Sequence, residues 1–243
     1  VAGILYATAG PDVLYYIVSG IGITSVWPTV LLPKLTGGEP NGKATLLGDI
    51  GAGLSYMRRT PLVLVMLLIG LVVALLAMPF RMLLPIFVVE IYHRGPGAMG
   101  LLVSMMGAGA LVGSLLIAAL GNKWKRGVIL IAGTLLAGVV LLLMALLPYY
   151  FAALGFMALL GVAHATHRTL TDSLIMEVTE AQYRGRVMGV IFMNNAFFPL
   201  AVIPAGIAAE FLGGQVTIGA MAVLLLAFTM WIIVTQKSLR DTR

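Results

Sequence analysis

Four ionisable residues occur within nine positions of this sequence: His164, His167, Arg168 and Asp172. In a helix, residues three or four positions apart share a face, so the two histidines would lie side by side and Arg168 could pair with Asp172. A histidine titrates near neutral pH and can carry a proton. Proton transfer is therefore one interpretation of His164, and a histidine hydrogen-bonded in the protein interior is the other.

The histidine pair lacks the partners that a metal site or a catalytic site needs. No third ligand and no His-Glu-x-x-His motif accompanies the two histidines, and the sequence has no cysteine for a disulfide or a thiolate site. Neither a Gly-x-Ser-x-Gly motif nor a clustered pair of carboxylates is present. We therefore expect no metal, no cofactor and no enzymatic activity.

Two asparagines also interrupt an apolar stretch. Asn194 and Asn195 lie about 12 Å inside the helix that we expect to begin near Arg186, at a depth similar to that of His164. An amide inside a membrane needs a hydrogen-bond partner. The pair is therefore expected either to join neighbouring helices or to line a polar cavity.

Arg81 lies about 30 Å along the helix that we expect to begin at Pro61, which places it near the outer membrane surface. Glu90 could pair with it there. A structural or outer-gate role, snorkelling to the interface and direct substrate binding are the interpretations of Arg81. Six further polar residues are expected at cytoplasmic helix ends, where they either form gating contacts or only anchor the topology. They are Asn122, Lys123, Lys125, Arg126, Arg184 and Arg186.

The segments that must position these residues are long and apolar. Apolar residues make up 60% of the 243-residue chain and charged residues 10%, with a mean hydropathy of +1.06. A soluble domain would not have that balance, whereas a helix takes about 20 apolar residues to cross a bilayer. The sequence predicts an all-α polytopic membrane protein. Six complete spans are expected after residue 60, over 61–87, 99–120, 128–147, 149–170, 187–212 and 216–234.

The remaining segments connect or precede these spans. Residues 33–60 are polar, but apolar side chains at helical spacing predict an amphipathic helix lying on the membrane. Residues 172–186 are expected to form a polar loop. Before the linker we expect the end of a truncated helix, a turn at Gly10–Asp12 and a span over 13–32, with further helices upstream.

The distribution of positive charge predicts the orientation. If the linker is cytoplasmic and the spans alternate, the cytoplasmic segments hold 12 of the 15 lysines and arginines, while the outer turns hold only Arg94. Cytoplasmic loops carry such an excess of Lys and Arg. The C-terminus is therefore expected inside, and the net charge of +6 needs no nucleic-acid partner.

Polar residues are distributed unevenly among the six spans. The third (128–147) and sixth (216–234) contain almost only apolar side chains and threonine. Because polar groups in a membrane face a bundle interior or a cavity, these two spans are predicted to face lipid. The other four are predicted to surround a cavity.

Three short motifs in the sequence are distinctive. The run Gly-Ser-Leu-Leu-Ile-Ala-Ala-Leu-Gly-Asn-Lys-Trp-Lys-Arg-Gly at 113–127 resembles the C-terminal echo of the signature loop between the second and third helices of the major facilitator superfamily of transporters, with Asn122 where an Asp is usual. Arg-Gly-Arg-Val-Met-Gly at 184–189 and Tyr-Met-Arg-Arg-Thr-Pro at 56–61 are similar to the exporter branch that includes the enterobactin exporter. Peripheral third and sixth helices also suit this fold.

The resemblance implies a proton-coupled exporter of small amphipathic molecules, drug-like or siderophore-like, that works by alternating access in the plasma membrane. Its partners would be the lipid bilayer, the substrate and a missing N-terminal half of the same polypeptide. A sensor or scaffold on the same fold is the alternative. The predicted domains are the end of an N-terminal helical bundle (1–32), the linker (33–60), a C-terminal six-helix bundle (61–236) and a cytoplasmic tail (237–243).

Overall fold

The computed structural model describes residues 2–30, 51, 55–58, 60–120, 125–180 and 183–235. Most of the predicted linker, Asn122, Lys123 and the predicted tail lie outside these residues. Asn194 and Asn195 belong to a described helix, but their side chains lie outside what the structure describes. The predictions that concern these groups therefore stay predictions.

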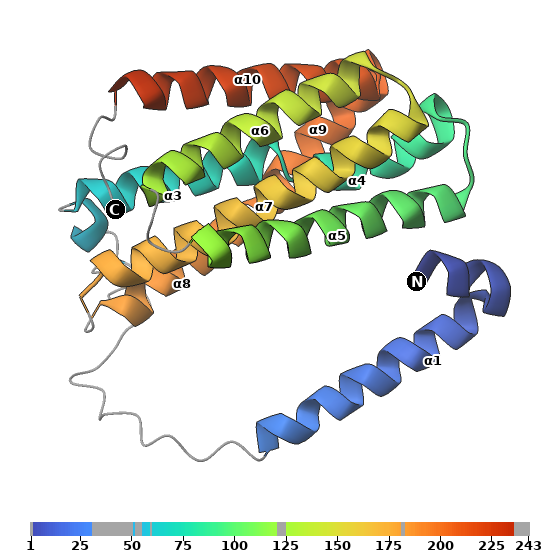
Figure 1. Cartoon of the computed structure of the whole chain (residues 1–243), viewed down its shortest axis with the longest axis horizontal. Coiled ribbons are helices and arrows are strands. Elements are labelled where there is room, and N and C mark those ends of the chain that lie inside the picture. Colours follow the sequence, from blue (N-terminus) through green and yellow to red (C-terminus); the bar gives the residue numbers. More distant parts are fainter. Residues whose placement is uncertain are drawn as a thin grey trace.

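The described chain is built from helices and contains no strand. Labelled as in Figure 1, the elements are α1 (Ala2–Val30), α3 (Pro61–Leu76), α4 (Phe80–Ile86), the π-helical turn η1 (Phe87–Ile91), α5 (Pro96–Leu120), α6 (Arg126–Leu146), α7 (Tyr150–Val178), α8 (Arg184–Ala196), α9 (Phe198–Leu212) and α10 (Gly214–Thr235). By length and composition, five stretches can cross a membrane: Val63–Ile91, Pro96–Ala119, Arg126–Leu146, Tyr150–Val178 and Gly214–Thr235. The all-α membrane fold is confirmed.

Helix α1 differs from its prediction. It continues from Ala2 to Val30, so the turn predicted at Gly10–Asp12 is wrong. Pro11 lies inside the helix, where its ring removes one backbone donor and favours a kink rather than an end. Figure 1 shows the axis of α1 bending close to its N-terminal end. Helix α1 contacts α5.

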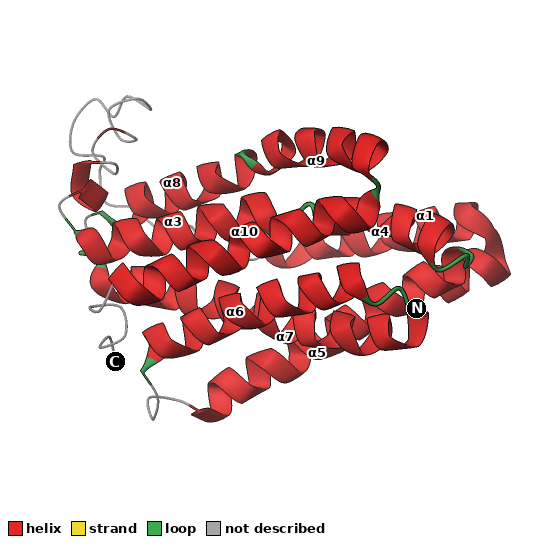
Figure 2. Ribbon diagram, turned by 90° about the horizontal axis from the view of Figure 1, so that it is seen from above, coloured by secondary structure: helices red, strands yellow, loops and turns green. Residues whose placement is uncertain are grey.

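Helix α7 lies at the centre of the packing. It has its most extensive contacts with α5 and α6, and α6 in turn packs against α10. Helix α3 contacts α7, α8, α9 and α10 on the other side. Figures 1 and 2 show these helices running along one common direction. One face of α7 therefore points toward α3, which also contacts α8.

The prediction that residues 128–147 face lipid fits only one side of α6. The helix packs between α7 and α10, where Leu130 and Met144 are buried, while Val128, Val139 and Leu146 are exposed along one side. Apolar side chains suit a lipid contact and a helix contact equally well. A lack of polar residues therefore does not show which of the two surrounds a span. Helix α10 keeps one exposed apolar face, with Val223 and Trp231 on it.

Prolines divide two of the predicted spans. The first ends as α3 at Leu76, turns at Ala77–Pro79 and resumes as α4, while Pro85 precedes the π-helical turn η1. The span predicted over 187–212 consists of two helices in the structure: α8 ends at Ala196 and α9 begins at Phe198, just before Pro199. A proline lacks the backbone donor that an unbroken helix needs.

Helix α7 is longer than the sequence suggested. The polar loop predicted over 172–186 is wrong in its first half, because α7 continues to Val178. Leu170, Leu174 and Ile175 are buried at helical spacing and extend the packed face past Asp172. Packing against neighbouring helices, and not the local polarity of the sequence, therefore determines where α7 ends.

Helices α5 and α7 approach so closely that backbone meets backbone. A Cβ atom built on Gly161 would lie 2.0 Å from the Met106 carbonyl oxygen, and one on Gly109 would lie 1.9 Å from the Ala158 oxygen. Only glycine fits at these crossing points. Small residues permit such contacts between membrane helices.

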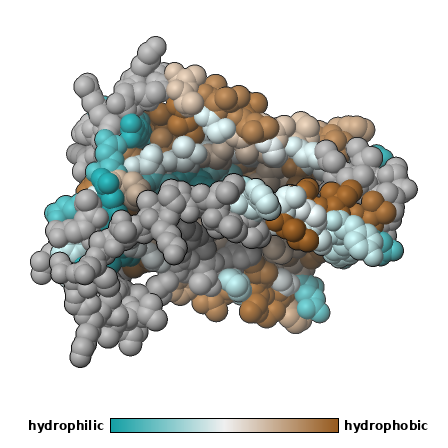
Figure 3. Space-filling view, turned by 90° about the horizontal axis from the view of Figure 1, so that it is seen from below, coloured by the Kyte–Doolittle hydropathy of each residue, from teal (hydrophilic) through white to brown (hydrophobic). Residues whose placement is uncertain are grey.

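The surface separates into apolar sides and polar ends. Figure 3 shows hydrophobic side chains along the length of the molecule and hydrophilic ones mainly toward its ends. Large apolar residues such as Leu115, Phe211 and Val234 are exposed. A bilayer slab covers an apolar band and leaves both polar ends in water.

Candidate functional site

A cavity of about 130 Å³ lies between α3, α7 and α8. Its polar wall comes from α7, because positions 164, 167, 168, 171 and 172 share one face of a helix. Its opposite walls are apolar and rich in methionine. The polar wall consists of His164, His167, Arg168, Thr171 and Asp172, and the methionines are Met66, Met78 and Met188.

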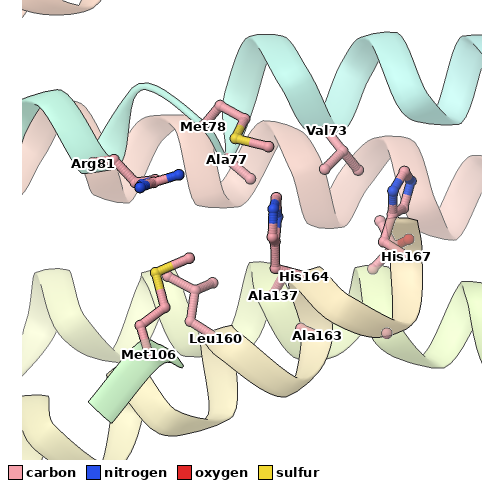
Figure 4. A pocket seen from close by; sticks show the side chains of 12 residues that line it. Val73, Ala77, Met78, Arg81, Met106, Ala137, Leu160, Ala163, His164 and His167 are labelled. Carbon is pink, nitrogen blue, oxygen red and sulfur yellow. The ribbon is translucent and has the colours of Figure 1, made fainter. Parts of the chain in front are cut away.

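A smaller cavity of about 20 Å³ adjoins the first. Val73, Met78, His164 and His167 line both. Figure 4 shows the guanidinium of Arg81 and the ring of His164 pointing into the same space, with the ring of His167 farther along α7. The structure thus brings Arg81 to the same connected site as the two histidines, although at least 83 positions separate it from them in the sequence.

Arg81 lies deeper than residue counting suggested. It shares a cavity with His164, which is the central residue of the 29-residue helix α7. Counting along one straight helix from Pro61 does not apply, because the chain turns at Ala77–Pro79 before it reaches Arg81. Glu90 lies on η1 with an exposed side chain and lines neither cavity. Within the described chain, no ion pair joins Arg81 to Glu90.

Arg168 and Asp172 line the larger cavity without pairing with each other. Among the described residues, the structure forms no ion pair between them. Arg168 is exposed and Asp172 is half-buried. Both charges therefore remain available to a ligand. In the described part of the chain, no three residues of the metal-ligating types lie close enough to hold a metal ion.

Two atoms in the cavity wall are buried without a hydrogen-bond partner in the described structure. They are Nε2 of His167 and Oγ1 of Thr171. The sequence analysis missed Thr171, although its spacing of four from His167 and seven from His164 places it on the same helix face. A buried polar atom without a partner costs about 1–3 kcal/mol. The cavity wall therefore carries two buried polar atoms whose hydrogen-bonding capacity is unused in the described structure.

The described residues among those predicted at cytoplasmic helix ends lie at one end of the bundle. Arg126, at the start of α6, forms an ion pair with Glu177 near the end of α7. Arg184 donates its Nε hydrogen to the Thr179 carbonyl oxygen at 3.2 Å. Lys125 is exposed at the N-cap of α6. Arg126 and Arg184 thus tie the ends of α6, α7 and α8 together.

A tyrosine from the end of the linker also binds this end of α7. The Tyr56 hydroxyl donates to the Val178 carbonyl oxygen at 3.4 Å and accepts from the Glu180 backbone N–H at 3.2 Å. Its ring stacks on Tyr183 with ring centroids 4.6 Å apart, and the Arg186 guanidinium lies 5.8 Å from the Tyr183 centroid. Tyr56 therefore caps the C-terminus of the helix that carries the cavity wall.

The opposite end is closed by aromatic residues. Tyr92 and Tyr150 meet edge to face with centroids 5.9 Å apart, and the Arg94 guanidinium lies 5.5 Å from the Tyr150 centroid. Tyr150 also donates to the Ala98 carbonyl oxygen at 3.1 Å. Burial raises the pKa of Tyr92 to about 12. The Tyr92 hydroxyl therefore stays neutral at physiological pH.

Comparison with known proteins agrees with this architecture. The family model described as Major Facilitator Superfamily matches the chain twice, over residues 1–198 and 72–242. No solved structure matches the chain.

Three curated relatives illustrate the similarity. Macrolide efflux protein A of Streptococcus pyogenes is 23% identical over 88% of this chain and 54% of the relative. Multidrug efflux pump Tap of Mycolicibacterium fortuitum is 24% identical over 93% and 56%, respectively. Enterobactin exporter EntS of Escherichia coli O1:K1 is 25% identical over 91% and 50%. The chain spans about half the length of the curated relatives it matches.

Proposed function

Because this chain belongs to the Major Facilitator Superfamily, we propose that it works in a secondary active exporter of small amphipathic molecules. Two helical bundles would rock around a site near the membrane midplane and expose it to each side in turn. The names of the relatives, which refer to macrolide efflux, multidrug efflux and enterobactin export, support the direction and the drug-like or siderophore-like substrate class.

One observation carries the proposal: the larger cavity beside the middle of α7 has one polar wall and apolar walls opposite it. His164, Arg168 and Asp172 supply polar and charged groups on one wall, and methionines and aliphatic residues form the other walls. Polar groups are costly inside a bilayer and typically mark a substrate or ion pathway. Methionine adapts its shape to different apolar partners. This combination suits amphipathic molecules of varied shape.

Proton entry is the proposed source of energy. His164 lies at the centre of α7, where it lines both cavities. A histidine there could bind a proton while the site faces one side and release it while the site faces the other. We further propose that the protein lies in the plasma membrane with its C-terminus in the cytoplasm, as the distribution of lysine and arginine predicts.

Counterflow in proteoliposomes tests the transport proposal. Vesicles containing the full-length protein would be preloaded with unlabelled macrolide and diluted into labelled macrolide. A transporter accumulates the label transiently above its equilibrium level, because exchange needs no energy source. A sensor or scaffold on the same fold would show no accumulation above protein-free vesicles, and that result would reject the proposal.

A further inference from the structure

The larger cavity contains a threonine that does not behave like its neighbours in the membrane helices. Thr134, Thr217 and Thr229 each donate their hydroxyl hydrogen to the carbonyl four residues earlier, at 2.9, 3.0 and 2.7 Å. This bond satisfies a hydroxyl that has no water nearby. Thr171 is only 7% exposed, yet its Oγ1 has no partner in the described structure.

A second unpartnered atom lies one helical turn from Thr171. Nε2 of His167 is buried without a hydrogen bond among the described residues, and residues i and i+4 are neighbours on a helix surface. Both side chains line the same cavity of about 130 Å³. The wall facing them offers Met66, Met188 and Ile191, which cannot satisfy them strongly.

We infer that His167 Nε2 and Thr171 Oγ1 form a paired subsite for a hydroxyl group of the substrate, whose apolar body lies against the methionine wall. The inference rests on the proposed function. A hydroxyl both donates and accepts, so it can accept from Thr171 and donate to His167, or the reverse, whichever tautomer the imidazole adopts. A methyl group or a bare ring in its place would leave both buried atoms unsatisfied.

Removal of the hydroxyl group of Thr171 tests the subsite. Thr171→Val keeps the side-chain shape, and Thr171→Ser keeps the hydroxyl. The probe is a radiolabelled 14-membered macrolide, which carries several hydroxyls, and the protein is the full-length transporter in nanodiscs. We expect Thr171→Val to weaken equilibrium binding roughly 5- to 100-fold and Thr171→Ser to restore most of the affinity. His167→Phe should weaken binding to a similar extent.

Thr229→Val is the matched control. Thr229 is buried on α10 and lines neither cavity of the site, and its hydroxyl is already bonded to the Leu225 carbonyl oxygen. Macrolide affinity should therefore be nearly unchanged. The unfolding temperature of the ligand-free protein supplies a readout that needs no probe: Thr171→Val should leave it unchanged or raise it, because it removes an unsatisfied buried atom.

Three results would overturn the inference: parental macrolide affinity in Thr171→Val, a lower unfolding temperature of that ligand-free variant, or no macrolide binding by the parent protein. The last would exclude the proposed ligand class. Failure of the proposed function looks different. If the parent protein binds macrolide through Thr171 but shows no counterflow, the subsite inference stands and the proposal of an exporter is rejected.

Discussion

His164 is the residue on which the proposed energy coupling depends. It faces Arg81 across the smaller cavity. In the larger cavity, it lies on the same wall as the other polar residues of α7. A structural histidine needs only its hydrogen bonds, whereas a proton carrier must titrate. Glutamine separates these roles, because its amide can donate and accept hydrogen bonds but cannot bind a proton near neutral pH.

We predict that His164→Gln abolishes pH-driven uphill export by the full-length protein but retains energy-independent exchange of substrate. Accumulation and counterflow in proteoliposomes, with and without a pH gradient, measure the two activities. His93→Asn is the control, since His93 lies in the turn between η1 and α5 at φ 50 and asparagine tolerates that backbone. Uphill export by His164→Gln at the parental rate would show that this histidine is structural.

Tyr92 gives a prediction about pH and stability. Its pKa is about 12 in the folded protein against 10.0 for an ordinary tyrosine, because burial disfavours the phenolate. Between these values the folded state holds the proton more strongly than the unfolded state, so stability falls as pH rises from 10 to 12.

We predict that Tyr92→Phe removes this alkaline loss, which amounts to about 2–3 kcal/mol over the window. At neutral pH the variant should be as stable as the parent, because the Tyr92 hydroxyl is buried without a partner in the described structure. Thermal unfolding in detergent at several pH values measures both effects. Tyr149→Phe, at an exposed position, is the control substitution. A Tyr92→Phe profile identical to that of the parent would contradict the prediction.

At the scale of elements, the contact between α5 and α7 determines how rigidly the cavity wall is held. The two helices touch through backbone at Gly109 and Gly161. Such contacts permit weak Cα–H···O bonds and dense packing. A side chain at a crossing point meets backbone, which cannot rotate away, so the helices would have to separate.

We predict that Gly161→Ala lowers the free energy of unfolding by about 1–3 kcal/mol, as overpacking does in other proteins. Gly107→Ala on α5 is the matched control: no atom lies within 4 Å of its added Cβ, and alanine favours a helix over glycine. Thermal unfolding of the two variants in the same detergent gives the comparison. Equal unfolding temperatures would mean that α5 and α7 are not held this closely.

At the scale of the whole molecule, polar ends and apolar sides define a slab. The aromatic cluster with Arg94 closes one end, and the ion pair between Arg126 and Glu177 lies at the other. The positive-inside rule predicts that the second end faces the cytoplasm. Chemical labelling from the two sides of the membrane tests this orientation directly.

We predict that a cysteine at position 94 reacts with an impermeant maleimide from outside intact cells, whereas one at position 125 reacts only after permeabilisation. Both native residues are exposed, and the chain has no cysteine of its own, so each label reports one site. Denatured protein gives the maximum labelling of each variant. Reaction at position 125 in intact cells would show that this position faces outside and that the predicted orientation is wrong.

The amino-acid sequence by itself determined the membrane class and the polar face of α7. Long apolar runs are nearly sufficient evidence for membrane helices, because in lipid each helix satisfies its own backbone. Residues three and four apart share a helix face whatever the tertiary packing. The spacing of His164, His167, Arg168 and Asp172 therefore identifies them as one group, and Thr171 follows the same spacing.

Only the tertiary structure decided what that group faces. It placed Arg81 across from His164, paired Arg126 with Glu177, packed the apolar helix α6 between α7 and α10, and extended α7 past Asp172. These contacts join residues far apart in the chain. Their choice depends on how the helices pack, and apolar composition does not specify that packing, because lipid and a neighbouring helix offer an apolar side chain nearly the same surroundings.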